Sequence, residues 1–320
     1  MKYKKKILYI PQIISFILVF MSIISLSGCS YSGSGDNSPS GTKGLVMNIM
    51  ENSIPTRIYE NEPLYLQLRL KNEGSHDIRN GVLDVTVDQY SFSIENKEQF
   101  RTIELQGDSG NFEGEEKVQD IKLQSKEFAM EGTNAHDASI KINACYEYET
   151  FFQDVLCIDT DVRDIQAGKP CHTKAISGSR GQGAPVVVER VDPRISMGTN
   201  GARLTFDIYI KNSGSGTLLS EGAYERVCTS DFTSEDFDRV KIKEIEISTY
   251  ALSDGDIRCT SHVSDEFNIF DIHSETKDSI NCEVVEEIPY SLGTYSTPIA
   301  ITLSYGYLQS TQTSLKIEKR

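Results

Sequence analysis

Apolar and polar residues alternate along two stretches of this chain, and the two stretches are copies of each other. Residues 46–75 and 186–215 align without a gap, at an offset of 140 that carries Asn72 onto Asn212. A period of two is typical of a strand with one buried face. Each copy then ends in Asn-x-Gly-Ser, which favours a turn. The aligned apolar pairs are Leu64 and Leu204, Leu66 and Phe206, Leu68 and Ile208, and Leu70 and Ile210.

The ends of the two copies also match, at a larger offset. Residues 139–158 align with 298–317, so that Tyr146 falls on Tyr305 at an offset of 159. The offset is 140 at the start of the repeat and 159 at its end. The second copy therefore has a net insertion of 19 residues in its middle. We interpret each end as a closing hairpin, with the turn of the first copy at 149–154. The insertion is our predicted contact region.

Short strand-like runs separated by polar, turn-rich segments fill the middle of both copies, and helical periodicity is scarce. This pattern predicts an all-β fold with two tandem β-sandwich domains after an N-terminal signal or anchor helix. The predicted boundaries are 1–28 for the signal peptide or membrane anchor, 29–44 for a flexible Ser/Gly tether, 45–168 for the first sandwich, 169–184 for a junction and 185–320 for the second sandwich. The predicted inner residues of the second copy are Leu204, Phe206, Ile208, Ile210, Ile245, Ile247, Ile299, Ile301 and Leu303.

The N-terminus has a basic start, MKYKKK, and then no charged residue from Ile7 to Leu26. That arrangement is typical of an export signal, and the apolar run is also long enough for a membrane-spanning anchor. Leu26-Ser27-Gly28-Cys29 resembles the lipobox of prokaryotic lipoproteins, which implies that Cys29 carries a lipid. Both alternatives place the rest of the chain on the extracellular face of the cell membrane, attached through its N-terminus.

The negative net charge of the chain disfavours some classes of binding partner. The formal net charge is -15, and it becomes -19 when the four lysines of the leader are removed. An acidic surface repels phosphate backbones, so we expect no nucleic-acid partner. The chain has no Trp, and this absence argues against a dedicated carbohydrate site, because Trp is the strongest stacking platform.

Six cysteines remain once Cys29 is assigned to the lipid. An even number in an exported chain favours three disulfides. The spacing of the first two does not suit zinc, and no Cys-x-x-Cys redox pair occurs. The predicted pairs are Cys145–Cys157 across the first hairpin, Cys259–Cys282 within the second copy, and Cys171–Cys228 across its base.

Residues with metal or catalytic chemistry are sparse. None of the five histidines forms a metalloprotease motif. Asp159, Asp161 and Asp164 alternate near the junction and are candidate calcium ligands, although Arg163 stands where a third oxygen ligand would be expected. We therefore predict no catalytic residues and a protein that is not an enzyme.

The segment PVVVERVDPRISMGTNGARLTFDIYIKNSGSGTLL resembles the Ig-like modules, of the cell-adhesion-related type, of prokaryotic surface lipoproteins. The cysteines and tyrosines of CYEYET, together with GQGAPV, are similar to uncharacterised secreted proteins of small-genome archaea. The resemblance implies Ig-like sandwiches that act as structural or adhesive modules with a protein partner at the cell surface. The alternative is a surface binding protein for a soluble ligand or a carbohydrate.

Overall fold

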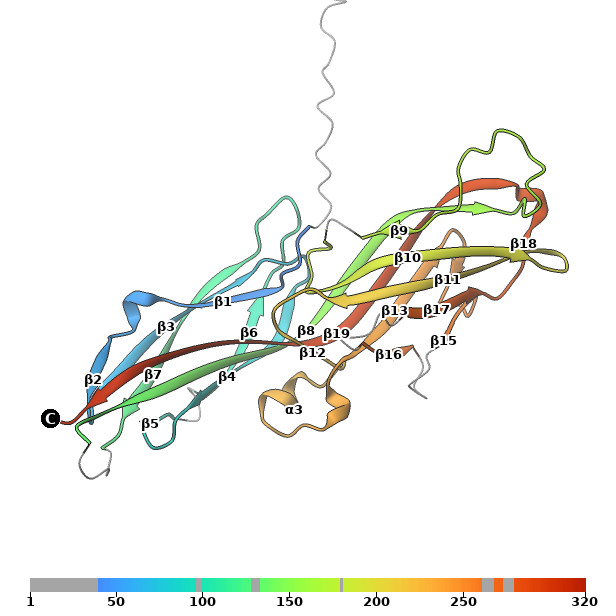
Figure 1. The fold of residues 1–320 in the computed structure, drawn as a ribbon. Helices are drawn as coiled ribbons and strands as arrows, with labels where there is room; N and C mark the ends of the chain where they lie inside the picture. Colours follow the sequence, from blue (N-terminus) through green and yellow to red (C-terminus); the bar gives the residue numbers. More distant parts are fainter. Residues whose placement is uncertain (1–39, 96–98, 128–132, 179–180, 261–267, 273–278) are drawn as a thin grey trace, which may run out of the picture. The chain divides into compact units, whose positions relative to one another are not determined.

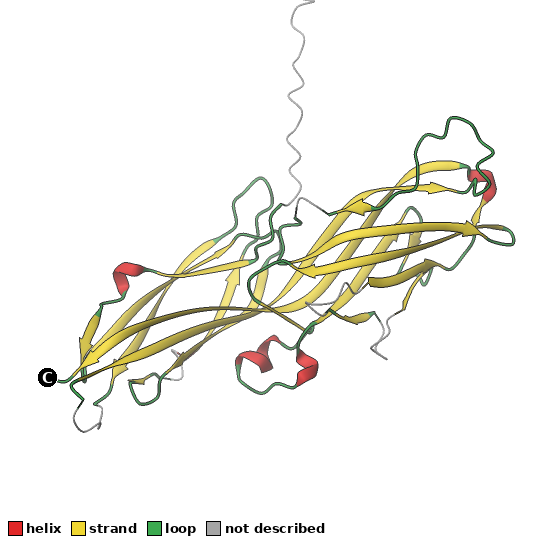
Figure 2. Cartoon of the chain, in the orientation of Figure 1, coloured by secondary structure: helices red, strands yellow, loops and turns green. Residues whose placement is uncertain are grey.

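Strands dominate the fold, and its helices are short (Figure 2). The computed structural model describes residues 40–95, 99–127, 133–178, 181–260, 268–272 and 279–320. Within those residues, no helix combines the length and the apolar character that crossing a membrane requires. The predicted leader and Cys29 lie outside the described residues. The prediction of an all-β fold is confirmed.

The described residues form three sheets (Figure 1). A four-stranded sheet has the order β1-β3-β7-β5, with β1 Leu45–Ile49, β3 Pro63–Asn72, β7 Glu116–Ser125 and β5 Phe92–Ser93. A six-stranded sheet has the order β15-β17-β11-β10-β9, and β18 also pairs with β11. Its strands are β15 Ile257–Thr260, β17 Ser279–Val284, β11 Gly201–Asn212, β10 Val186–Met197, β9 Ile176–Ser177 and β18 Ile288–Pro289.

The third sheet contains strands from both copies of the repeat. Its order is β14-β13-β19-β8-β4-β6, and β2, β12 and β16 pair at its margins. The strands are β14 Tyr250–Ala251, β13 Arg239–Ile247, β19 Thr294–Glu318, β8 Ala135–Asp159, β4 Ile78–Val87, β6 Phe100–Leu105, β2 Arg57–Tyr59, β12 Thr217–Leu219 and β16 Ile269–Asp271.

Strands β8 and β19 are each 25 residues long and pair with each other along their whole length (Figure 1). The two predicted closing hairpins are therefore wrong, because each is one continuous strand. Residues 149–154 looked like a turn since Glu149, Gln153 and Asp154 are polar. These side chains avoid the core, while Thr150 and Phe152 keep the alternation of buried positions.

The long strands join the two copies. The offset of 159 carries Glu147 onto Gly306, and these two residues are paired in the sheet. A pseudo-twofold axis therefore passes between them. Each copy contributes one long strand that continues past this axis into the sheet of the other copy. We call residues 45–125, 135–148 and 305–318 the first half, and the described residues from 149 to 304 the second half.

Residues Ser38–Arg320 cluster as one compact unit. The division into two separate sandwich domains stays a prediction. The inner residues predicted for the second copy are confirmed, since all nine are at most 8% exposed.

The same tyrosine contacts recur in both copies of the repeat. The hydroxyl of Tyr148 donates a hydrogen bond to Asn72 Oδ1 at 3.2 Å, and Tyr307 donates to Asn212 Oδ1 at 3.1 Å. Both tyrosines are almost completely buried. Each asparagine also accepts a bond from the N–H of the glycine two residues later, at 3.2 Å in both halves. The Asn-x-Gly-Ser turn is thus held by the long strand that ends the same copy.

The 19-residue insertion corresponds to residues 220–238, because Leu219 aligns with Arg79 at the first offset and Arg239 aligns with Asn80 at the second. It contains α3 (Tyr224–Cys228) and the turn η2 (Ser234–Asp236). Its apolar residues Ala223, Tyr224 and Val227 are buried against the outer face of the large sheet. The inner face of the predicted contact region is thus already occupied by the protein itself.

Three disulfides form: Cys145–Cys228, Cys157–Cys171 and Cys259–Cys282. The prediction of Cys259–Cys282 is confirmed, and the other two pairings are wrong. Cys145 and Cys157 lie on one continuous strand, where a rise of about 3.3 Å per residue separates them by about 40 Å. Cys145–Cys228 instead links the first copy to the insertion of the second. Three disulfides indicate an oxidising, extracellular environment.

Candidate binding site

A cavity of about 540 Å³ opens at the end of the second half that lies farthest along β8 from the pseudo-twofold axis. Three segments form it: the loop that follows β8, the turn between β10 and β11, and the turn η3 (Tyr290–Leu292) that precedes β19. We call it the tip pocket. Its volume lies within the range of small-molecule and peptide pockets, about 300 to 1,000 Å³.

Apolar side chains in the tip pocket face solvent. Ile165 is 77% exposed, Met197 is 52% exposed and Tyr290 is 41% exposed, and all three line the pocket. Val162 lines it as well. Isolated apolar residues on a surface are ordinary, but several around one concavity mark a binding site.

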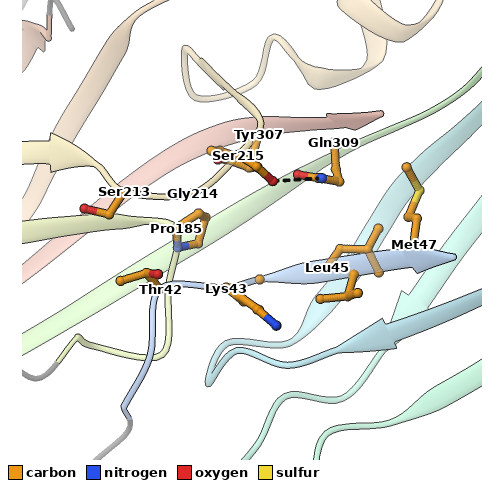
Figure 3. A pocket seen from close by; sticks show the side chains of 12 residues that line it. Thr42, Lys43, Leu45, Met47, Pro185, Ser213, Gly214, Ser215, Tyr307 and Gln309 are labelled. Atoms are coloured by element: carbon orange, nitrogen blue, oxygen red, sulfur yellow. Dashed lines mark hydrogen bonds between the residues drawn. The ribbon is translucent and has the colours of Figure 1, made fainter. Parts of the chain in front are cut away.

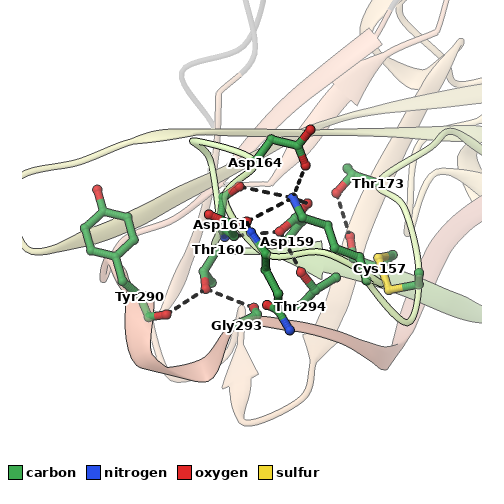
Figure 4. A network of polar contacts seen from close by, with 12 residues as sticks. Cys157, Asp159, Thr160, Asp161, Asp164, Thr173, Tyr290, Gly293 and Thr294 are labelled. Atoms are coloured by element: carbon green, nitrogen blue, oxygen red, sulfur yellow. Dashed lines mark hydrogen bonds and ion pairs between the residues drawn. A yellow bond between two sulfur atoms is a disulfide. The ribbon is translucent and has the colours of Figure 1, made fainter.

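A lysine organises the loop behind this pocket (Figure 4). The ammonium of Lys169 lies 2.7 Å from Asp159 Oδ2, 3.4 Å from Asp161 Oδ2 and 2.8 Å from Asp164 Oδ1. Its side chain is only 6% exposed. The three predicted calcium ligands are therefore brought together, but around a positive charge that belongs to the chain. Among the described residues, no group of three acidic, histidine or cysteine side chains is arranged to hold a metal ion.

The network shifts the protonation of its members. Partial burial would raise the pKa of Asp159, but hydrogen bonds from Lys169 and Thr294 outweigh it and hold the pKa below its ordinary value. The same pairing with Asp159, followed by that with Asp164, raises the pKa of Lys169. A hydrogen bond from the backbone N–H of Gln166 likewise lowers the pKa of Asp161, so Asp159, Asp161 and Lys169 are charged at neutral pH.

Further contacts lock the three segments together (Figure 4). Thr160 Oγ1 donates to the carbonyls of Tyr290, at 3.2 Å, and Gly293, at 2.9 Å. The hydroxyl of Tyr290 donates to the carbonyl of Gly198 at 2.9 Å, which ties η3 to the β10–β11 turn. The disulfide Cys157–Cys171 closes the base of the loop. The walls of the tip pocket are therefore fixed before any ligand arrives.

The β10–β11 turn is held by one carboxylate. Glu287 accepts hydrogen bonds from the backbone N–H groups of Thr199, Asn200 and Gly201 at 3.1, 2.6 and 3.0 Å. These bonds, first of all that from Asn200, lower the pKa of Glu287 to about 2. Glu287 therefore stays ionised over the physiological range and keeps Met197 in place beside the pocket.

Arg163 also lines the tip pocket, and it is exposed. Within the described ranges it forms no ion pair. In a chain with 47 acidic and 32 basic residues, most basic groups have acidic neighbours. An unpaired guanidinium beside apolar side chains favours a ligand that carries both an apolar group and a carboxylate or other anion.

A second, smaller cavity of about 300 Å³ lies next to the pseudo-twofold axis (Figure 3). It is formed by residues 42–47, by Pro185 and by the turn 213–215, with Tyr307 and Gln309 beside it. The N-terminal segment enters the fold here, where Gly41 pairs with Gly181. The carbonyl of Gly41 also accepts the N–H groups of Gln182 and Gly183 at 3.1 and 3.0 Å. This cavity therefore belongs to the attachment of the N-terminal segment.

One serine–histidine contact occurs in the first half. The Ser91 hydroxyl donates to Asp88, and its oxygen lies 2.7 Å from Nε2 of His136. Ser91 is fully buried, so no substrate carbonyl can reach it. Asp88 also accepts the backbone N–H of Tyr90 at 3.0 Å. The contact stabilises a turn and has none of the access that a nucleophile requires.

Comparison of the chain with protein-family models and with curated proteins gave no match.

Sequence reasoning found only part of the tip pocket. It singled out Asp159, Asp161 and Asp164, and the structure brings them together. It missed Lys169, which follows within the same loop and could have been recognised as a counter-charge. It also missed Met197 and Tyr290, because nothing in a single sequence indicates that these distant residues converge on the loop after β8.

Proposed function

We propose that this protein is a non-catalytic, exported surface module that binds a protein partner through the tip pocket. The single observation that carries the proposal is an apolar concavity whose walls are held by ion pairs, hydrogen bonds and a disulfide, while its apolar side chains stay exposed. A fixed apolar site loses little conformational entropy on binding, so it suits recognition. The partner presents apolar side chains to Ile165 and Met197 and an anionic group to Arg163.

The anchor completes this proposal. Cys29 carries a lipid, or the apolar run before it stays in the membrane, and the Ser/Gly segment 29–44 is the tether that links this anchor to the fold. The hydrogen bonds of Gly41 beside the pseudo-twofold axis support attachment near the middle of the two long strands rather than at one end. The two halves are Ig-like sandwiches, as the motif resemblance implies, and the second half carries the binding site.

A soluble ligand is the second candidate. The volume of the tip pocket and the unpaired Arg163 favour a small apolar anion. A carbohydrate is less favoured, because aromatic platforms are not gathered in one place. The exposed tyrosines in the described part of the chain are Tyr59, Tyr65, Tyr90 and Tyr290, and only Tyr290 lines the pocket.

Site-specific photo-crosslinking on intact cells tests the proposal. A photoreactive amino acid at Ile165 should give one discrete adduct, which is lost when Met197 is replaced by Asp. The control position is Phe112 in the first half, which is 79% exposed and should give none. No adduct at Ile165, or equal adducts at both positions, would contradict a partner at the tip pocket.

A further inference from the structure

The outer edge of β8 is open in the second half. Strand β4 pairs with β8 only from Ile140 to Cys145. Beyond that, β19 pairs with one edge of β8, and no described strand pairs with the other. An open strand edge presents unpaired N–H and C=O groups to any strand that approaches it.

The direction of the backbone groups follows from two contacts. The N–H of Val155 turns to its neighbour Asp154 Oδ1 at 2.6 Å, and the carbonyl of Cys157 accepts Thr173 Oγ1 at 3.2 Å. Because both groups of a residue in an antiparallel strand point to one side, the odd-numbered residues face the open edge. Within the described residues, no backbone partner is present for Phe151 or Gln153.

The repeat provides an internal control for the side chains. At the offset of 159, Phe151, Gln153 and Val155 align with Ser310, Gln312 and Ser314 of β19. All six residues are exposed. Phe151 is 51% exposed and Val155 is 61% exposed. The motif therefore carries Ser310 and Ser314 at these exposed positions in the first half, and Phe151 and Val155 at the aligned positions in the second half.

The edge is complementary to itself. An antiparallel pair of two β8 edges centred on Gln153 places Phe151 opposite Val155 of the second copy, twice, and Gln153 opposite Gln153. Apolar cross-strand pairs of this kind stabilise a sheet. Glu149 falls opposite Cys157 and Asp154 opposite Phe152, so no two like charges face each other. The chain already contains one such arrangement, since β8 and β19 pair antiparallel about an internal pseudo-twofold axis.

We propose that two copies of this protein associate through their β8 edges, from Phe151 to Val155, so that the large sheet continues from one copy into the other. This twofold contact is isologous, with the same patch on both copies. The contact is short, because Thr173 occupies the carbonyl of Cys157 and limits its length. The dimer is therefore weak in dilute solution and favoured at a membrane, where anchored copies are concentrated.

Cysteine crosslinking on the full chain tests the register. Gln153 lies on the proposed twofold axis, and hydrogen-bonded partners in antiparallel strands have Cα atoms about 5.5 Å apart, which suits a disulfide. Under mild oxidation, Gln153→Cys should give a disulfide dimer at least ten times faster than Gln312→Cys, its aligned control. Phe151→Cys alone should not crosslink, because its own copies lie several residues apart. Equal rates for Gln153→Cys and Gln312→Cys would overturn the proposal.

Analytical ultracentrifugation gives an independent readout without new cysteines. The unmodified chain should show an average mass that rises with concentration. Phe151→Ser with Val155→Ser, which installs the residues of the first half, should abolish this rise at an unchanged melting temperature. A chain that stays monomeric at millimolar concentration, or a serine variant that dimerises equally well, would overturn the proposal.

Discussion

The two halves hold their central turns in the same way but differ at their margins. In both, a buried tyrosine from a long strand bonds an asparagine, and the asparagine bonds a glycine N–H. In the first copy Tyr146 accepts the N–H of Leu45 at 3.1 Å, and in the second copy Tyr305 accepts that of Val186 at 3.4 Å. Leu45 aligns with Pro185, which has no N–H, so the bond moves one residue along. The centre of the repeat is kept even where its residues change.

The two halves differ in regions away from these central turns. Within the part of the chain that the structure describes, the insertion 220–238, the tip pocket and the open β8 edge all belong to the second half. All three disulfides involve it: two lie within it, and the third ties its insertion to β8 of the first half. We infer that the paired strands and the tyrosine contacts provide the framework, and that the binding features were added to one half, which contains segments of both copies.

The largest stability effect should come from the link between the copies. The loss of Cys145–Cys228, which closes 83 residues, should lower the free energy of unfolding by about 4.5 kcal/mol on the loop-entropy account, against about 3 kcal/mol for Cys157–Cys171. Denaturant unfolding of Cys145→Ala/Cys228→Ala and Cys157→Ala/Cys171→Ala measures both. A smaller loss for the first pair would show that the insertion is held without its disulfide.

Glycine at the shared turn should be the next most sensitive position. A Cβ at Gly74 would overlap the hydroxyl of Tyr148 and approach the carbonyls of Gly183 and Lys43. A Cβ at Gly214 would overlap the hydroxyl of Tyr307 and contact the ring of Pro185. Overpacking of this kind costs about 1 to 3 kcal/mol.

We therefore expect Gly74→Ala to lie at the upper end of that range and Gly214→Ala below it, because Gly74 also meets two backbone carbonyls, which cannot move aside. Thermal unfolding of both variants measures the difference. If Gly214→Ala were the more damaging, the equivalence of the two turns would need revision.

Lys169→Met should loosen the tip pocket without unfolding the protein. It leaves Asp159, Asp161 and Asp164 close together with no counter-charge, so amide hydrogen exchange should rise in residues 160–170 at neutral pH. Lys174→Met removes the same charge from an exposed position in the following segment and serves as the control.

The pKa of Asp159 is lowered in the folded protein, so its stabilising contribution is present above its ordinary pKa of 3.8 and is lost as the pH falls further. The excess exchange of Lys169→Met should therefore shrink in acid. If the faster hydrogen exchange of Lys169→Met persisted unchanged below that pH, its cause would be the lost packing of the aliphatic part of the lysine side chain and not the lost charge.

The smallest effect should come from Glu287→Gln. With a pKa lowered from 4.5 to about 2, the carboxylate stabilises the β10–β11 turn above pH 4.5, and this contribution is lost as the pH falls toward 2. The melting temperatures of the wild type and of Glu287→Gln should therefore differ at neutral pH and converge in acid. A constant difference would show that its charge has no part in the effect.

The sequence was most informative where one face of a strand is buried and the other is exposed. The alternation at Leu64–Leu70 and Leu204–Ile210 located the central strands and the inner residues, because burial imposes that period. It failed at 149–154, where polar residues on the open face of a long strand have the composition of a turn. The number of disulfides followed from the even cysteine count, but their pairing depends on which strands are neighbours.

The candidate site shows the same limit. Asp159, Asp161 and Asp164 are close in sequence, so their convergence could be predicted. Tyr290 and Met197 lie near these aspartates because β8 and β10 end, and β19 begins, at the same end of the fold. That arrangement depends on how β8 and β19 pair along their length. The insertion was correctly located in the middle of the second copy, but a count of residues could not indicate that its apolar face packs on the sheet.

The central claim is that the two copies form one interlocked fold, joined by β8, β19 and a disulfide. Non-reducing peptide mass spectrometry of the native protein tests it most directly. The account predicts peptides linking Cys145 to Cys228, Cys157 to Cys171 and Cys259 to Cys282. A peptide linking Cys145 to Cys157 would contradict it, because that bond requires the strand to fold back as a hairpin and would separate the two copies.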